Sequence, residues 1–422
     1  MRGKAVDLFC GAGGMGLGVE RAGFDVVAAV DVDPVHAAVH SYNFPVCRTV
    51  CGDLTKMSAK EIYDGPVDLV FGGPPCQGFS NIGRRNVDDA RNQLVGHFLR
   101  LVGEFRPRAF IFENVPGLIE KRNIGVIEWL SAEFSKLGYT VPDWKVLDAS
   151  DFEIPQSRER LFLIGTLDGK SFQYPTGSGR RTSVREAIGD LPNVDDFEEL
   201  LKSDEVICRF GIPSSYAGKL RDMRPGLKDL LTCSARTTHC EAVRLRFQKT
   251  PPGKFEPVSN FFKLDPDGLC NTLRAGTGPE RGSFTSPRPI HYEHARCVTV
   301  REMARMHSYP DWFRFHKTNG HGARQIGNSV PPLLAEELAR ALGLHLNVLP
   351  TPSIDPTKDV RFLGMTLTQM ERRGAFRTPE ACPVQTGDPR LLRMTWSQAA
   401  RHFGLIPRYP QRKKVDHEKR TP

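Results

Sequence analysis

A cysteine lies in a stiff loop in the first quarter of the chain. Residues 72–80 read GGPPCQGFS and follow an apolar run that ends at Phe71. A thiolate is a strong nucleophile, and open α/β sheets bind ligands at the carboxyl ends of their strands. A buried structural thiol is the commoner fate of a single cysteine, but it does not account for the constrained loop around it. The pattern therefore predicts Cys76 as a nucleophile.

A carboxyl group and two guanidinium groups accompany other apolar runs. Glu113 follows the run 109–112, and Arg158 and Arg160 precede the run 161–164. A solvated loop glutamate and a surface ion-pair segment remain sufficient explanations for each group alone. If these runs are strands of one sheet, Glu113 lies at the same rim as the cysteine.

A glycine cluster near the start of the chain favours a nucleotide-type ligand. Residues 9–18 read FCGAGGMGLG, and Asp31 follows Gly11 by 20 positions, the spacing of a ribose-binding carboxylate. The alternative is a tight strand-to-helix turn. Asp53, within CGDL at 51–54, is a third candidate contact with a nucleoside, although a turn or helix cap explains it equally well.

The elements that must position these groups are short apolar runs separated by helix-length stretches. The runs lie at 5–9, 26–30, 67–71, 109–112 and 161–164. This alternation predicts a doubly wound α/β fold, with a parallel sheet covered by helices on both faces. From about residue 170 to 295 the sequence is rich in Gly, Pro, Ser and Arg, which indicates a smaller, loop-rich domain. Helical periodicity returns at 300–306 and 332–346.

Composition excludes several classes of protein. The chain has 422 residues, 39% of them hydrophobic and 25% charged, so it is neither disordered nor fibrous. Its longest uncharged run, 69–83, contains two prolines and is shorter than the roughly 18 residues that span a bilayer. The N-terminus lacks a secretory signal pattern, which predicts a cytoplasmic protein. Ten cysteines without a Cys-x-x-Cys pair give little support to disulfides or structural zinc.

The basic excess is concentrated at one end of the chain. The net charge is +9, of which residues 351–422 carry +7. A solubilising tail explains this charge, but so does a segment that adds contacts to phosphate groups irrespective of DNA sequence.

In this order, the motifs resemble those of the cytosine-5 DNA methyltransferase family. The likeness extends to two later blocks, REMARMHSYPD at 301–311 and QIGNSVPP at 325–332, so it covers residues 5 to about 345. One departure is His307-Ser308-Tyr309, where the family more often has Gln-Gly-Phe, a change expected to affect helix packing rather than chemistry. Another is the tail beyond about residue 350, which the family core does not require.

The resemblance implies a reaction and a methyl donor, S-adenosylmethionine. Cys76 would add to carbon 6 of cytosine, so that carbon 5 can attack the methyl group. Glu113 would bind or protonate ring nitrogen 3 and contact the exocyclic amine. Arg158 and Arg160 would hold the carbonyl oxygen of the base and organise the cysteine loop.

For the methyl donor, the resemblance implies a set of contacts from both ends of the chain. Phe9, Gly11 and Gly13 would bind the methionine and ribose end, Asp31 the ribose hydroxyls, Val32 the adenine face and Asp53 the adenine amine, while Asn328, Ser329 and Val330 would close the pocket. No metal is required.

The resemblance also implies an architecture: a Rossmann-like methyltransferase sheet with a smaller target recognition domain. Residues 1–168 would form the first part of the catalytic and cofactor-binding domain, 169–296 the recognition domain, 297–349 the closing part and 350–422 a basic extension. Within the second segment, Thr272 and Leu273 resemble a Thr-Leu pair of the family.

Double-stranded DNA is the implied partner. The target cytosine would be flipped out of the duplex, and the loop from Gln77 to about Arg100, with Arg84, Arg85 and Arg91, would close over the DNA. The expected protein is a monomer in the bacterial cytoplasm, associated with the nucleoid. A cognate restriction endonuclease acting on the same site is a further partner that the resemblance allows.

Three alternatives stay open at this stage. A transfer RNA cytosine-5 methyltransferase of the same superfamily would use the same chemistry, although the long insertion at 170–295 favours DNA. A nicotinamide-dependent dehydrogenase would share the glycine loop but leave the cysteine loop unexplained. A non-catalytic DNA-binding relative would have no reason to keep Cys76, Glu113 and both arginines.

Overall fold

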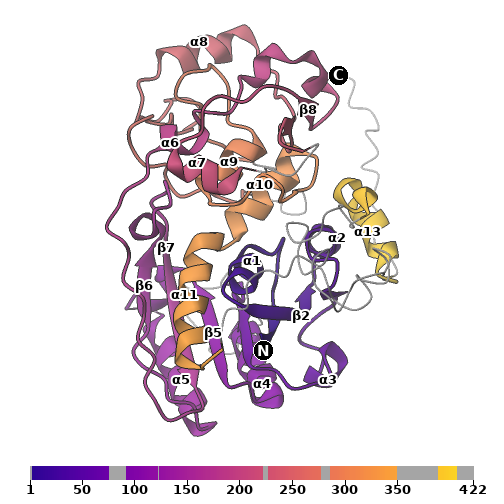
Figure 1. Ribbon diagram of the computed structural model, residues 1–422, viewed down its shortest axis with the longest axis vertical. Helices are drawn as coiled ribbons and strands as arrows, with labels where there is room; N and C mark the ends of the chain where they lie inside the picture. Colours follow the sequence, from indigo (N-terminus) through magenta and orange to yellow (C-terminus); the bar gives the residue numbers. More distant parts are fainter. Residues whose placement is uncertain are drawn as a thin grey trace, which may run out of the picture.

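A seven-stranded sheet forms the core of the lower body of the molecule (Figure 1). A computed structural model describes residues 2–75, 92–121, 123–221, 227–276, 286–348 and 388–405. The strands are β1 (Gly3–Leu8), β2 (Phe24–Asp31), β3 (Arg48–Cys51), β4 (Leu69–Gly72), β5 (Ala109–Asn114), β6 (Lys145–Asp148) and β7 (Glu159–Thr166). Their order is β3-β2-β1-β4-β5-β7-β6, so the chain reverses its winding between β1 and β4. Ligands bind at such a reversal in open α/β sheets.

One strand runs against the others. The pairs β1–β2, β2–β3, β1–β4 and β4–β5 are parallel, but β7 is antiparallel to both β5 and β6. The predicted parallel sheet is therefore found for β1 to β5, and β7 departs from it. The reversal places the start of β7 beside the carboxyl end of β5, where Glu113 pairs with Phe162.

Helices cover both faces of the sheet, because alternate strand residues point to opposite sides. One core contains Phe71 and Ile111 together with residues of α1 (Gly14–Arg21), α2 (Pro34–Asn43) and α11 (Pro332–His345). The other contains Val70 and Phe110 together with residues of α3 (Ala59–Ile62), α4 (Asn92–Phe105) and α5 (Ile124–Lys136). The predicted doubly wound α/β sheet is confirmed.

The end of the family-like region returns to the start of the chain. Helix α11 packs along α1, at the height of Gly18. A Cβ atom at Gly18 would lie 2.5 Å from the backbone of Pro332 and of Glu336, so glycine is required for this close approach. Residues more than 300 positions apart thereby form one edge of the site.

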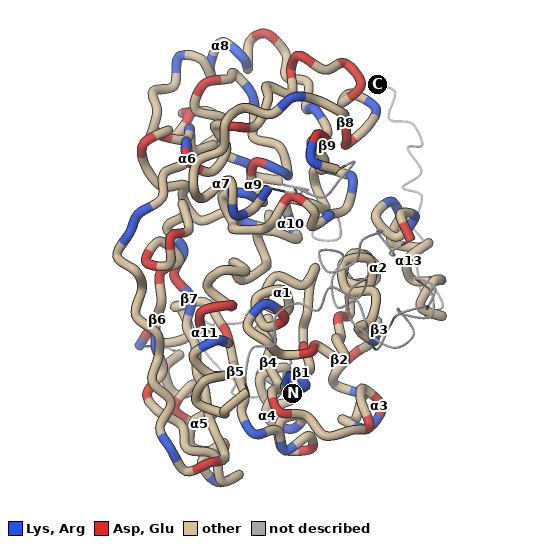
Figure 2. Tube along the Cα trace, viewed as in Figure 1, with Lys and Arg blue, Asp and Glu red and all other residues tan. Residues whose placement is uncertain are grey.

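The upper body contains short elements joined by long loops (Figure 1). They are α6 (Val184–Ile188), β8 (Val206–Ile207), α7 (Ser215–Leu220), β9 (Leu230–Leu231), α8 (Glu241–Lys249), α9 (Val300–Met306) and α10 (Asn319–Asn328), with short 3-10 turns such as η3 (Val194–Asp196) and η4 (Glu198–Leu201). Buried ion pairs stabilise it: Arg305 pairs with Asp190 at 3.1 Å and with Asp311. Both signs of charge are interspersed over both bodies (Figure 2).

A C-terminal segment returns to the lower body. The 3-10 helix η6 (Pro389–Arg393) and helix α13 (Trp396–His402) pack against α2 (Figure 1). Across the described ranges, no helix has the length and apolar character needed to cross a bilayer.

Candidate active site

Three strand ends meet at one corner of the sheet. After β4, the loop from Gly73 to Pro75 lies against the end of β5: a Cβ atom at Gly73 would be 2.4 Å from Glu113 Oε2. The side-chain amide of Asn114 donates a hydrogen bond to the carbonyl oxygen of Pro74, at 3.1 Å. Cys76, the predicted nucleophile, lies outside the described residues, but the backbone that leads to it is fixed here.

Glu113 and Arg160 form an ion pair at this corner. Arg160 Nε lies 3.0 Å from Glu113 Oε1, and both side chains are largely buried. Burial raises the pKa of Glu113, and the positive charges of Arg160 and Arg158 oppose this shift only in part. The carboxyl group therefore holds its proton to a higher pH than a solvated glutamate would.

Arg158 lies deeper than Arg160 and has different partners. Its guanidinium donates hydrogen bonds to the carbonyl oxygens of Leu273 (3.0 Å), Gly327 (2.8 Å) and Ser329 (2.8 Å). The side chain is fully buried. The sequence interpretation gave the two arginines one shared role. In the structure, Arg160 pairs with Glu113, whereas Arg158 joins its own segment to the backbone at residue 273 and at residues 327–329.

Gln156 and His307 complete the set of bonds around Arg158. The N–H of Leu273 donates to Gln156 Oε1 at 3.2 Å, so Gln156 Nε2 faces His307 Nδ1 at 2.9 Å and donates to it. His307 Nε2 then carries the ring hydrogen and donates to the Ser329 carbonyl at 3.1 Å. Burial and the nearby Arg158 lower the pKa of His307, in keeping with this neutral tautomer.

The glycine loop shapes the rim between β1 and β2. Phe9, Gly11 and Gly13 have positive φ values of 65°, 55° and 100°. The N–H of Gly11 donates to Asp31 Oδ2 at 2.8 Å, which fixes the loop to the end of β2. Helix α1 begins at Gly14 and directs its free N–H groups toward this rim.

Asp31 is held by several groups at once. Asp33 N–H donates to Asp31 Oδ1 at 2.8 Å, and His36 Nδ1 lies 3.8 Å from the same oxygen. Burial alone would raise the pKa of Asp31, but the nearby His36 and the hydrogen bonds from the N–H groups of Asp33 and Gly11 outweigh burial and lower this pKa. The carboxylates of Asp33 and Asp31 raise the pKa of His36 to about 9 against its burial, so Asp31 and His36 are both charged at neutral pH.

The remaining predicted cofactor contacts differ in exposure. Val32 is 69% exposed at the end of β2, where an apolar side chain can pack on a flat ring. Asp53 accepts hydrogen bonds from the N–H and hydroxyl of Thr55, which is the turn interaction noted as its alternative, and its side chain is 42% exposed. Asn328 is exposed at the end of α10.

Ser329 and Val330 lie directly beside the start of α1. A Cβ atom at Gly14 would be 2.6 Å from the Val330 carbonyl and 2.8 Å from Ser329 Cβ. The glycine loop and the segment from the far end of the chain are therefore in contact, as closure of one pocket by both would require.

Three residues of this site received no role in the sequence analysis. Asn114 and Gln156 occur within the quoted motifs, but only the structure shows what they bind. His36 carries no motif at all. Its position five residues after Asp31, in the first turn of α2, is the only signal in the sequence.

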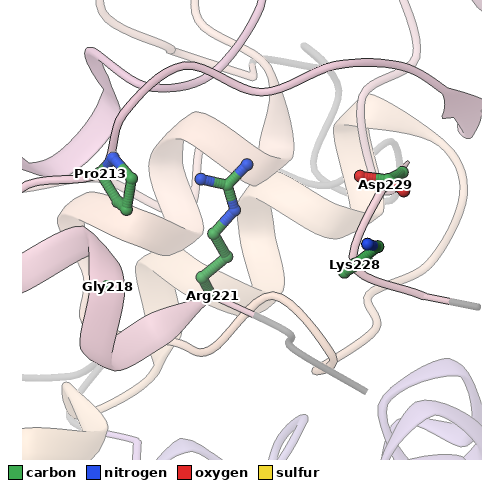
Figure 3. Close-up of a pocket in the computed structure, with 5 residues that line it drawn as sticks. All are labelled: Pro213, Gly218, Arg221, Lys228 and Asp229. Carbon is green, nitrogen blue, oxygen red and sulfur yellow. The ribbon is translucent and has the colours of Figure 1, made fainter. Parts of the chain in front are cut away.

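A cavity of about 270 Å³ lies in the upper body, away from these strand ends (Figure 3). Pro213, Gly218, Arg221, Lys228 and Asp229 line it. Arg221 lies 3.7 Å from Asp190 and stacks over the ring of Phe210, so its guanidinium is already paired. Within the ranges given above, no cluster of three or more His, Cys, Asp or Glu is arranged to hold a metal.

The fold and the corner define a class: a Rossmann-like methyltransferase sheet with a glycine-rich rim at β1–β2 and a buried acid at β5. The sequence profile of the family described as C-5 cytosine-specific DNA methylase matches residues 3–344. The chain therefore belongs to this family and is a cytosine-5 DNA methyltransferase.

Individual relatives agree with this assignment. The Type II methyltransferase M.XorII of Xanthomonas oryzae is 50% identical over 80% of this chain and 83% of its own length. M.AgeI of Thalassovita gelatinovora is 30% identical over 82% of this chain and 100% of its own. A prophage-encoded Escherichia coli protein described as a DNA modification methyltransferase superposes with a TM-score of 0.69 at 33% identity, covering 82% of this chain and 99% of its own.

Proposed function

We propose that the chain methylates carbon 5 of a cytosine flipped out of a specific, short duplex DNA site, with S-adenosylmethionine as donor. The observation that carries this proposal is the corner where the Gly73–Pro75 backbone lies against Glu113 and Glu113 pairs with Arg160. It brings a buried acid and a cation next to the residues that precede Cys76.

Cys76 acts as the nucleophile in this proposal. Carbon 5 of cytosine is a poor nucleophile until the thiolate adds to carbon 6, which forms a C–S bond and moves an electron pair of the ring toward carbon 5. Carbon 5 then attacks the methyl group of S-adenosylmethionine, so that a C–C bond forms while the methyl–sulfur bond breaks and its electron pair stays on the departing sulfur. Loss of the carbon 5 proton and expulsion of the thiolate restore the ring and the enzyme, so the base exchanges one proton for one methyl group.

Glu113 and Arg160 stabilise the charge that develops on the base. Because burial raises its pKa, Glu113 can share a proton with ring nitrogen 3 while the thiolate adds. Arg160, whose Nε is paired with Glu113, contacts the carbonyl oxygen of the base through its remaining donors.

Arg158 acts as a positioning residue rather than as a contact to the base. It fixes the carbonyl oxygens of Leu273, Gly327 and Ser329, and Gln156 and His307 fix two of the same segments. The corner at Glu113, the backbone around Leu273 and the segment 327–329 are thereby held in one arrangement.

The residues at the β1–β2 rim suit S-adenosylmethionine, which supplies an electrophilic methyl group when bound. Phe9, Gly11 and Gly13 give the backbone close approach that a ligand needs, and the charged Asp31 suits ribose hydroxyls. Exposed Val32 suits the adenine face, Asp53 its amine, and Asn328, Ser329 and Val330 the closing side.

The chain from residue 169 onward supplies the remaining parts of the proposal. Residues 169–296 would read the DNA sequence, 297–349 would close the catalytic domain, and 350–422 would add a basic extension. Because relatives such as M.XorII are named as Type II methyltransferases, we further propose a role in a bacterial restriction-modification system with a cognate endonuclease.

The test is transfer of labelled methyl from S-adenosylmethionine to unmethylated plasmid DNA, with bisulfite sequencing of the product. We expect methylated cytosine at one short motif, and none with Cys76→Ala. Cys240→Ala is the control, because Cys240 is an exposed thiol of the upper body. Transfer to transfer RNA but not to DNA, or full activity of Cys76→Ala, would contradict the proposal.

A further inference from the structure

Helix α2, which covers the sheet, is buried on almost every side. Nine of its ten residues are buried, whereas only three of the thirteen residues of α5 are. A helix with one apolar face needs only the sheet as a partner, but a helix that is apolar all round needs a second one. The sequence of α2, PVHAAVHSYN, has no Lys, Arg, Asp or Glu.

The second partner is the C-terminal segment, residues 388–405. Its helices η6 and α13 both pack on α2 (Figure 1). Leu391 and Leu392 are 5% exposed, and Ala399 and Ala400 are fully buried, although the segment itself is short. These side chains cover the face of α2 that points away from the sheet.

Hydrogen bonds to two backbone carbonyls fix this segment to residues 316 and 317. Lys317 N–H donates to the Leu392 carbonyl at 3.1 Å, and His316 Nε2 lies 3.2 Å from the Met394 carbonyl. The last residue of α2, Asn43, exchanges two hydrogen bonds with the backbone of Arg314, at 2.8 and 3.0 Å. The stretch 314–317 therefore anchors both α2 and its cover.

The opposite end of α2 belongs to the cofactor rim. Asp33 caps the helix by accepting from the N–H of Val35 at 2.8 Å, and His36 in the first turn pairs with Asp31. Asp31 in turn binds the N–H of Gly11 in the glycine loop. A displacement of α2 would consequently move His36, the residue of this helix that pairs with Asp31.

We propose that residues 388–405 form a clamp that positions α2, and through it Asp31 and the glycine loop, for binding of S-adenosylmethionine. This inference rests on the proposed function. The clamp lies beyond residues 3–344, the part of the chain that matches the family. Because α2 contributes nothing to the Glu113–Arg160 corner, the clamp affects cofactor binding and leaves the chemical step intact.

The direct test replaces the clamp's buried side chains in the full-length protein. In the double variant Leu391→Ala, Leu392→Ala, we expect the Kd for S-adenosylmethionine from titration calorimetry to rise at least about fivefold. kcat at saturating S-adenosylmethionine should stay unchanged, because only binding is lost. Leu391→Met, Leu392→Met should restore the affinity. Arg390→Ser is the matched control, since that side chain is 85% exposed and pairs only locally, with Asp388.

A second measurement needs no variant. Coupling between two sites is reciprocal, so S-adenosylmethionine should slow hydrogen exchange in residues 391–402 as well as in α2. If the double variant fails to fold, this exchange experiment on the wild-type protein still decides the matter.

The outcomes separate the inference from the function on which it rests. If the wild type methylates DNA but the double variant binds S-adenosylmethionine as tightly as it does, or if protection stops at α2, the clamp is wrong and the proposed function stands. If the wild type neither binds S-adenosylmethionine nor transfers methyl to DNA, both are wrong.

Discussion

Glu113 combines an ion pair with a raised pKa, and the balance between the two determines its chemistry. The Arg160 charge at 3.0 Å favours the carboxylate, while burial favours the acid, and burial is the larger effect. The site therefore contains an acid that keeps its proton to a higher pH than a solvated glutamate does, held in place by a neighbouring cation.

Replacing this acid tests its role. We expect Glu113→Gln to lower kcat for methyl transfer by roughly 100-fold or more, because the amide keeps the shape of the side chain but cannot supply a proton. Glu159→Gln is the control: Glu159 is an exposed glutamate next to Arg160 and should be replaceable without loss. Equal kcat values for the wild type and Glu113→Gln would refute the assignment.

The raised pKa also fixes the sign of a pH effect on stability. Stability from the protonated, buried Glu113 is fully present below its ordinary pKa of about 4.5 and is lost as pH rises through the raised value. The Tm of the wild type should therefore fall relative to that of Glu113→Gln as pH increases from 4.5. A Tm difference between the two proteins that does not change with pH would contradict the shift.

At this scale the sequence predicts only part of the site. Glu113 and Arg160 were predicted from motifs, and the structure places them together. The bonds of Arg158 and Gln156 were not predictable, because they join residues more than 100 positions apart. The bond of His307 to Ser329 was not predictable either, because it ends on a backbone carbonyl, a group that every residue possesses. The imidazole of His307, in the segment where the sequence departs from the family pattern, has a polar partner on each side. The departure therefore changes polar contacts as well as helix packing.

Among the elements, the direction of β7 matters most for the site. Because β7 is antiparallel to β5, its first residues lie at the edge where β5 ends, beside Glu113. In a parallel arrangement, Arg160 would lie at the opposite edge of the sheet. The sequence predicts the five main strands, but an apolar run has the same pattern in either direction, so strand direction required the structure.

The contact of α1 with α11 gives a prediction for two helical glycines. A Cβ atom at Gly18 would lie 2.5 Å from backbone atoms of α11, whereas a Cβ atom at Gly96 in α4 would meet nothing within 4 Å. We expect Gly18→Ala to destabilise the protein by about 1–3 kcal/mol through overpacking. Gly96→Ala should instead stabilise it by about 0.5–1 kcal/mol, through helix propensity.

Thermal unfolding of both variants checks this account of the two helices. The Tm should fall for Gly18→Ala and stay level or rise for Gly96→Ala. If both substitutions shift Tm in the same direction and by the same amount, helix propensity alone controls these positions, and the close approach of α1 and α11 is not needed to explain them.

Over the whole molecule, contacts distant in sequence connect the two bodies. Arg158 joins the sheet to Leu273 and to Ser329, and residues 314–317 bind both α2 and the C-terminal clamp. Renewed helical periodicity at 332–346 predicted that the chain returns to its first domain there, and the structure places the helix α11 against α1 in the lower body. The docking of 388–405 was not predicted, because a short apolar pattern does not identify the helix that it covers.

The covalent step is the central claim of this account, and trapping it is the most direct test. In a duplex with 5-fluorocytosine at the site mapped by bisulfite sequencing, fluorine cannot leave as a proton does, so methylated base should stay bonded to the enzyme. We predict a DNA-linked protein whose modified peptide contains Cys76, absent with Cys76→Ser and retained with Cys240→Ser. A linkage to another residue, or methyl transfer to ordinary DNA without any trapped product, would contradict the mechanism.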